Sequence, residues 1–348
     1  MLCFLVLEPL TAAERARATF FAPGKAGPSG QRVGGVTSKM GQNPSYIALH
    51  ERGELAERIS ALRTILGNCT LCARRCGVDR LAGELGYCRA GAKAVVASAF
   101  AHFGEEAPLV GTCGSGTIFL AHCNLRCVFC QNFDISHAGQ GWEVTASALA
   151  DTMVGLQELG CHNINFVTPT HFTPQIVEAL PAAIERGLRA PLVYNCGGYE
   201  SVETIALLEG VFDIYMPDAK FAEQAAARRY CDAPDYFEVN KHVLREMHRQ
   251  VGELRTDDSG IAYRGLLIRH LVMPNNVAGS EAVLHFIAEK LSVYSYVNIM
   301  AQYRPCYQAH RYPEIARRVT PREVAEAVRI ARSLGLNRGL EEYSDTWW

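Results

Sequence analysis

The sequence has no long apolar run and no excess of charge of one sign. None of its apolar stretches reaches the roughly 18 residues of a membrane-spanning helix. The formal net charge is −2 over 348 residues, so no basic face indicates nucleic acid as a partner. The N-terminus also lacks the basic start and long apolar core of a signal peptide. We therefore expect no membrane segment and no nucleic-acid partner.

The first 40 residues differ in composition from the rest of the chain. Residues 22–39 are rich in Gly, Pro and Ser and show no hydrophobic period. Such a segment cannot bury enough apolar surface to fold alone. We therefore expect an extension, residues 1–40, that is disordered, and a start of translation at Met40 remains an alternative.

Cysteine, in contrast, is abundant, with 13 residues that are clustered rather than spread. Clustered cysteines with C-x2-C spacing in a large chain indicate metal binding and a reducing compartment, so we expect a cytoplasmic protein. The length suits one large domain and a smaller module. We expect a Cys-rich N-terminal module over residues 41–112 and the large domain over 113–340.

From residue 117 onward, short β-rich runs alternate with helical patterns. Leu149, Met153 and Leu156, for example, recur on one helical face. Six βα units with right-handed crossovers predict an α/β fold, an open partial (βα)6 barrel related to the TIM barrel. The predicted strands are 117–121, 163–168, 191–195, 212–216, 265–272 and 296–302, and the predicted helices are 146–159, 174–186, 201–209, 235–251, 281–291 and 321–334.

The most informative motif is the C-x3-C-x2-C spacing of Cys123, Cys127 and Cys130 directly after the first predicted strand. Three thiolates this close can hold three irons of a cubane cluster and leave the fourth iron open. An open iron can bind and activate a small molecule. A structural metal loop of the zinc type, or three buried free thiols, is the alternative.

This spacing resembles the signature of the radical S-adenosylmethionine (SAM) enzymes. Phe129 matches the aromatic residue that lies against the adenine in that family. The resemblance implies a [4Fe-4S] cluster, SAM as cofactor, and a 5′-deoxyadenosyl radical that abstracts hydrogen from a substrate. It also implies an electron donor such as flavodoxin or ferredoxin.

Residues after the next strands should face the same cavity. Thr168 and Thr170 stand where the family usually has a Gly-Gly-Glu run, so hydroxyls replace the carboxylate that receives the SAM amino group. An ordinary turn explains them equally well. Asn195 and Gly197 occupy the place of an Asp-Thr-Asn-Gly run of the activating-enzyme branch, and the glycine lets a ligand approach the backbone.

Charged residues follow or interrupt the last strands. Asp218 and Lys220 resemble the Asp-x-Lys motif of pyruvate formate-lyase activating enzyme, which implies contacts with the SAM amine, or a monovalent cation, and with the SAM carboxylate. An exposed ion pair is the alternative. Arg269 interrupts an apolar strand and could meet a bound carboxylate. The adjacent His270 is more simply a hydrogen-bonded core residue.

A second cysteine set precedes the barrel. Cys69, Cys72, Cys76 and Cys88 form C-x2-C-x3-C-x11-C, which suits a closed zinc site or a second iron–sulfur cluster; thiols that merely pack are the alternative. With Gly-Tyr-Cys at 86–88, the pattern resembles a branch related to pyruvate formate-lyase activating enzymes. Five further cysteines have no ligand spacing: Cys113, Cys161, Cys196, Cys231 and Cys306. Cys196 lies in the expected cavity and could be functional, and the others read as small buried hydrophobes.

The resemblance therefore predicts a radical SAM enzyme that activates a partner protein by forming a glycyl radical. Modification of another peptide or a small molecule is an alternative within the same class. A non-catalytic iron–sulfur or zinc binding module is the alternative from another class. The substrate itself is not specified by these motifs.

Overall fold

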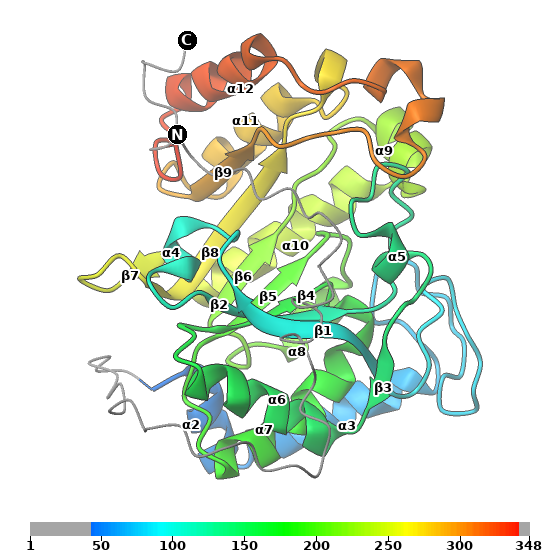
Figure 1. The fold of residues 1–348 in the computed structure, drawn as a ribbon, viewed down its shortest axis with the longest axis vertical. Helices are drawn as coiled ribbons and strands as arrows, with labels where there is room; N and C mark the ends of the chain where they lie inside the picture. Colours follow the sequence, from blue (N-terminus) through cyan, green and yellow to red (C-terminus); the bar gives the residue numbers. More distant parts are fainter. Residues whose placement is uncertain (1–42, 341–348) are drawn as a thin grey trace, which may run out of the picture.

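The computed structural model describes residues 43–340, and its centre is a sheet with six parallel strands (Figure 1). These strands lie side by side in the order β2-β4-β5-β6-β8-β9. All six match predicted strands, although their ends are shifted. They are β2 (Ser115–Leu120), β4 (Ile164–Val167), β5 (Leu192–Cys196), β6 (Ile214–Pro217), β8 (Ala262–Leu271) and β9 (Tyr296–Met300).

Each of these strands is followed along the chain by one of the predicted helices. The last begins as expected, since Thr320 and Glu323 form a capping box around Pro321. Figure 1 shows α6, α7 and α8 below the strands and α11 and α12 above them. The six helices are α6 (Ala146–Glu158), α7 (Thr173–Glu185), α8 (Val202–Leu207), α10 (Tyr236–Val251), α11 (Ser280–Lys290) and α12 (Pro321–Ser333).

The sheet also has antiparallel strands that were not predicted. β1 (Ala94–His102) lies between β2 and β3 (Trp142–Val144), antiparallel to both, and β7 (Arg255–Thr256) pairs with β8. The alanine-rich sequence of β1 gives little strand signal. The other elements outside the prediction are α2 (Ser45–Glu51), α3 (Glu54–Leu66), α4 (Ala107–Val110), α5 (Phe133–Ser136), α9 (Gln224–Cys231), and the 3-10 turns η1 (Thr170–Phe172), η2 (Pro274–Asn276), η3 (Ala309–Arg311) and η4 (Pro313–Ile315).

Both faces of the parallel sheet are covered. Phe166 and Tyr194 point into the main core, shared with the helices. The alternate residues Val193 and Met216 pack instead with Leu109, which α4 brings across the other face. Successive side chains of a strand point to opposite faces of the sheet, so neighbouring residues join different clusters. The structure is thus a mixed α/β fold with a mainly parallel sheet, and the partial barrel stays a prediction.

The residues predicted to form a separate module share this core. Tyr46, Leu62 and Cys69 belong to the same buried cluster as the residues of the parallel strands. The boundary between residues 112 and 113 stays a prediction, and the expected disorder of 1–40 lies outside the described residues. Among the helices of residues 43–340, none combines the length and apolar character needed to cross a bilayer.

Candidate functional site

The C-x3-C-x2-C loop begins where β2 ends. His122, with a φ of +70°, turns the chain out of the strand. Two backbone hydrogen bonds then hold the loop on the end of α9. The Arg126 N–H donates to the Cys231 carbonyl at 3.2 Å, and the Val128 N–H donates to the Tyr230 carbonyl at 2.9 Å. The loop is therefore fixed at both sides, by the sheet and by a helix.

The three thiols of this loop are close enough to affect one another's ionisation. Cys123 lies within electrostatic range of Cys127 and Cys130, and all three sense the Lys220 ammonium. Burial raises the pKa of Cys123, and it raises the pKa of Cys130 to about 11. A backbone N–H opposes this at each, since Leu125 donates to the Cys123 sulfur at 3.4 Å and Asn132 donates to Cys130. These donors favour the thiolate that a metal requires.

This donor set fits a cubane cluster better than a single ion. Within residues 43–340, no three His, Cys, Asp or Glu side chains stand at the spacing of one bound metal ion. Each thiolate of a cluster binds its own iron, so its ligands stand further apart. Three partly buried thiols within electrostatic range of one another, two of them with a backbone N–H donor, fit that requirement.

A fourth thiol lies against the motif, and the sequence pattern missed it. The Cys231 sulfur, at the end of α9, is 3.0 Å from the Cys127 sulfur. The contact with Cys231, together with burial, raises the pKa of Cys127 well above its usual range. Cys231 is 104 residues away in the chain and has no ligand spacing, so only the packing of α9 on the loop reveals it.

Asp218, Lys220, Arg269 and Asn195 form one network at the ends of β5, β6 and β8. Asp218 bonds Lys220 and also accepts from Arg269 Nε at 2.9 Å. Arg269 Nη2 donates to the Asn195 side-chain oxygen at 2.7 Å. Burial disfavours the Asp218 carboxylate, but Arg269 and Lys220 hold its pKa below the usual range. These residues form a buried network rather than the exposed ion pair that was the alternative.

Two acidic residues missed by the sequence interpretation lie in a segment that crosses the same face of the sheet. Glu105 is 3.9 Å from Arg269 Nη1, with only 9% of its side chain exposed. Its neighbour Glu106 accepts from Asn298 of β9 at 2.9 Å. Burial raises the pKa of Glu105, although Arg269 opposes the shift. The pair precedes β2 within the predicted N-terminal module, so no strand-end pattern pointed to it.

The two threonines after β4 differ in their surroundings. Thr168 adopts a φ of +60°, and its N–H donates to the Asn195 carbonyl at 2.8 Å. Thr170 is fully buried and donates to Glu200 at 3.0 Å. That carboxylate also accepts from the Tyr194 hydroxyl at 3.1 Å, and burial raises its pKa to about 7. The Thr170 hydroxyl can donate to a ligand only if its bond with Glu200 breaks.

The glycines after β5 allow two loops to touch. Gly198 has a φ of +74°, and a Cβ there would stand 2.2 Å from the Asp218 carbonyl oxygen. The Asn240 amide donates to both the Gly198 and Asp218 carbonyls, at 3.0 and 2.9 Å. At Gly197 a Cβ would meet side chains instead, Leu125 at 2.9 Å and Lys220 at 3.9 Å. The strained position is thus Gly198, beside the Gly197 that the sequence singled out.

The remaining predicted residues of this region are apolar or satisfied. Phe129 is 6% exposed and packs edge-on against Phe221 and Tyr303, with ring centroids 6.0 and 5.9 Å apart. His270 is fully buried, with Nδ1–H donating to the Ala219 carbonyl at 2.7 Å and Nε2 accepting from Ser280 at 2.8 Å. His270 is therefore a hydrogen-bonded core residue.

The four N-terminal cysteines gather in one place. Cys72 lies within electrostatic range of Cys69 and Cys88, and Cys88 within range of Cys76. Backbone N–H groups donate to Cys72 from Arg74 and to Cys88 from Ala90. These N–H donors favour thiolates, although among residues 43–340 these cysteines, like those of the motif, do not stand at the spacing of one bound ion. A metal at this place, and its nature, stay predictions.

A buried arginine links these cysteines to the strand ends. Arg80 is 1% exposed. Its guanidinium donates to the Gly91 carbonyl at 3.1 Å from Nε and to the His171 carbonyl at 2.7 Å from Nη1. The loop between Cys76 and Cys88 is thereby attached to the turn that follows β4.

Comparisons with known proteins place the chain beside one curated relative. No known family profile matches it. HydG, a maturase of the [FeFe]-hydrogenase, aligns with 13% identity over 63% of this chain and 49% of its own, at a TM-score of 0.45. AnSMEcpe with bound AdoMet aligns with 9% identity over 61% and 57%, at 0.40. The chain spans about half the length of these solved structures, and likenesses this distant do not identify a function.

The curated relative is much closer. MJ0674 of Methanocaldococcus jannaschii, an uncharacterized protein, is 33% identical over 289 residues, which are 80% of this chain and 79% of its own. Identity at this level over most of both chains reflects a common fold and ancestry. The chain belongs to the family of MJ0674.

Proposed function

We propose that this chain is a radical SAM enzyme. The observation that carries the proposal is the convergence of the Cys123, Cys127 and Cys130 thiols on a loop at the end of a central parallel strand, with Lys220 in electrostatic range. When bound there, a [4Fe-4S] cluster would supply an open iron and one electron, which cleave SAM to methionine and a 5′-deoxyadenosyl radical.

The chain's own residues would bind and orient the cofactor. Asp218 and Arg269 are hydrogen-bonded to each other. On binding SAM, Asp218 would instead accept from the SAM amine, and Arg269 would donate to the SAM carboxylate. Asn195 offers an amide, and Gly197 offers backbone without a Cβ, on which the Leu125 side chain packs. Phe129 provides an apolar wall, and Leu109 closes the opposite end of this face against water.

The test is anaerobic reconstitution with iron and sulfide, followed by measurement of bound iron and of 5′-deoxyadenosine. Cys127→Ala should lose the SAM-binding cluster and all cleavage, because two thiolates hold a cubane poorly. Cys231→Ala is the matched control, since it removes a thiol 3.0 Å away that is not in the motif. Normal cleavage by Cys127→Ala would refute the proposal and favour a binding module without turnover.

For the substrate, we propose a glycyl residue of a partner protein, supported by the likeness of Asp218 and Lys220 to the Asp-x-Lys motif of a glycyl-radical activase. We place the reaction in the cytoplasm, with flavodoxin or ferredoxin as electron donor. The free thiols of the described cysteines fit a reducing compartment.

The substrate is tested by incubation with pyruvate formate-lyase, SAM and reduced flavodoxin, which should give a glycyl radical signal by electron paramagnetic resonance. Release of 5′-deoxyadenosine without that signal would favour another peptide or a small molecule.

A further inference from the structure

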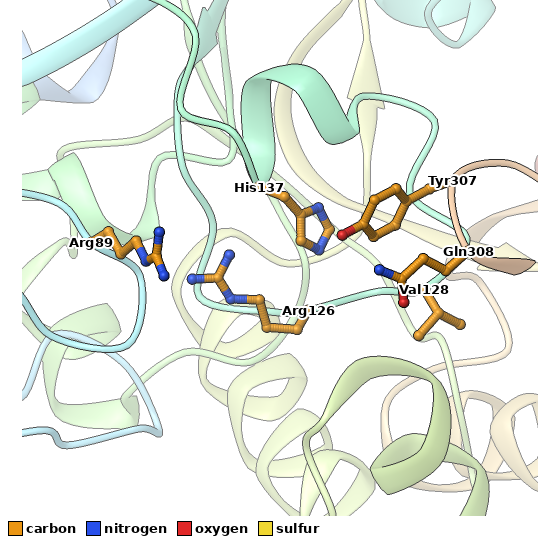
Figure 2. A pocket seen from close by; sticks show the side chains of 6 residues that line it. All are labelled: Arg89, Arg126, Val128, His137, Tyr307 and Gln308. Atoms are coloured by element: carbon orange, nitrogen blue, oxygen red, sulfur yellow. The ribbon is translucent and has the colours of Figure 1, made fainter.

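A cavity of about 360 Å³ opens beside the C-x3-C-x2-C loop. Its walls come from three segments: the residue after Cys88, the cysteine loop with the adjoining α5, and the chain beyond β9. Figure 2 shows the lining side chains around one space. They are Arg89, Arg126, Val128, His137, Tyr307 and Gln308.

The charge in this cavity is of one sign. Two arginines line it and no carboxylate does. Figure 2 shows their guanidinium groups turned toward each other. Arg126 donates from Nη2 to the Tyr87 carbonyl at 2.8 Å, whereas the Arg89 guanidinium has no hydrogen bond or ion pair with any residue of 43–340. Facing like charges repel, and an anion between them would remove that cost.

The histidine of this lining adds no charge of its own. Burial, together with Arg126, lowers the pKa of His137. Its imidazole is therefore neutral near pH 7, and the two guanidinium groups are the cations of the cavity lining.

The opposite wall is aromatic and held in place. The Tyr307 ring stacks on Phe133 with centroids 5.0 Å apart and lies 4.9 Å from His137. Arg89 and Tyr307 both adopt left-handed backbone, with φ values of +61° and +49°. Such conformations cost about 1 to 3 kcal/mol in non-glycine residues and persist where the surroundings impose them. Both residues are therefore positioned by the fold.

We propose that this cavity binds an oxyanion, a phosphate or carboxylate group carried by a small molecule. The planar arginine forks match the paired oxygens of such groups. The volume lies within the range of small-molecule sites, and Tyr307 and Gln308 offer a ring face and an amide to the rest of the ligand. The site is separate from the Asp218 and Arg269 network and does not depend on SAM chemistry.

Isothermal titration calorimetry on the anaerobically purified full chain tests the proposal, with inorganic phosphate and succinate as probes in separate arms. At least one should bind, and its affinity should fall about tenfold or more in Arg89→Ala. The affinity should stay unchanged in Arg322→Ala, which removes an exposed arginine of α12. The affinity of Arg89→Lys should lie between those of the unmodified chain and Arg89→Ala. Lysine keeps the positive charge but cannot donate two parallel hydrogen bonds to one anion.

The two arms distinguish the sources of the anion. Tighter phosphate binding identifies a phosphorylated ligand, and tighter succinate binding identifies a carboxylate. If neither probe binds, or if Arg89→Ala binds both as tightly as the unmodified chain, the proposal is wrong. Because binding is read without SAM turnover, this outcome is independent of the cleavage assay.

Discussion

Arg269 joins Asp218 and Asn195, donating to the first from Nε at 2.9 Å and to the second from Nη2 at 2.7 Å. One side chain from β8 thus holds together the ends of β5 and β6. With Lys220 on the other Asp218 oxygen, two cations share one buried carboxylate. The network is therefore both a candidate ligand site and a contributor to stability.

Asp218→Asn should destabilise the protein by roughly 3 kcal/mol, because it leaves two buried cations without their shared partner. The double variant Asp218→Asn/Arg269→Met should lose less unfolding free energy than the two single variants lose in sum. Urea unfolding of the four proteins gives the coupling energy. Additive losses would mean that the carboxylate and the guanidinium stabilise the fold independently.

Gly198→Ala should cost at least about 2 kcal/mol, since the new Cβ meets the Asp218 backbone and requires a left-handed conformation. Gly197→Ala is the matched control: its Cβ meets side-chain atoms of Leu125 and Lys220 and no backbone atom, and we expect a smaller loss of stability. Thermal unfolding of both variants measures the difference. Equal losses would show that the Asp218 loop moves aside at little cost.

His270 should make stability depend on pH below neutrality. Burial lowers its pKa from 6.5 to about 4 in the folded protein, so the unfolded chain binds the proton first as pH falls. Stability contributed by the neutral ring is complete above pH 6.5 and is lost toward pH 4, by roughly 3 kcal/mol. His270→Asn keeps the donor to Ala219 but does not titrate, so its unfolding free energy should fall less steeply between pH 6.5 and pH 4. Equal slopes for this variant and the unmodified protein would contradict the prediction.

Cys72→Ala should lower stability more than SAM affinity, because a metal that organises a small loop contributes folding free energy. Cys113→Ala, a partly exposed thiol without ligand spacing, is the control. Metal analysis of anaerobically purified protein identifies the site. Near-stoichiometric zinc beside about four irons supports a closed zinc site, and about eight irons without zinc indicates a second cluster.

The parallel strands and their helices could be predicted because each carries a strong local signal. The helical period of Leu149, Met153 and Leu156 and the cap at Thr320 are examples. The strand β1 could not, because Ala94–His102 is rich in alanine and its burial shows no clean alternation, although it pairs with β2 and β3 on its two sides.

Within the site, residues next to strand ends could be named from the sequence, whereas contacts across the chain could not. Glu105 reaches Arg269 from a loop 164 positions earlier, and Cys231 reaches Cys127 from the end of a helix. Neither has a spacing that links it to its partner. Such pairs arise from the packing of distant segments, and no local sequence pattern indicates that packing.

Arg80 ties the cysteine-rich loop to the sheet, and this attachment has a consequence for how the molecule opens. Its buried guanidinium bridges the Gly91 and His171 carbonyls, and its own N–H donates to Leu66 at the end of α3. Separating the loop from the sheet would leave a buried cation without acceptors. Backbone amides of the loop and of the η1 turn should therefore exchange with solvent deuterium in a single concerted event, as one cooperative unit.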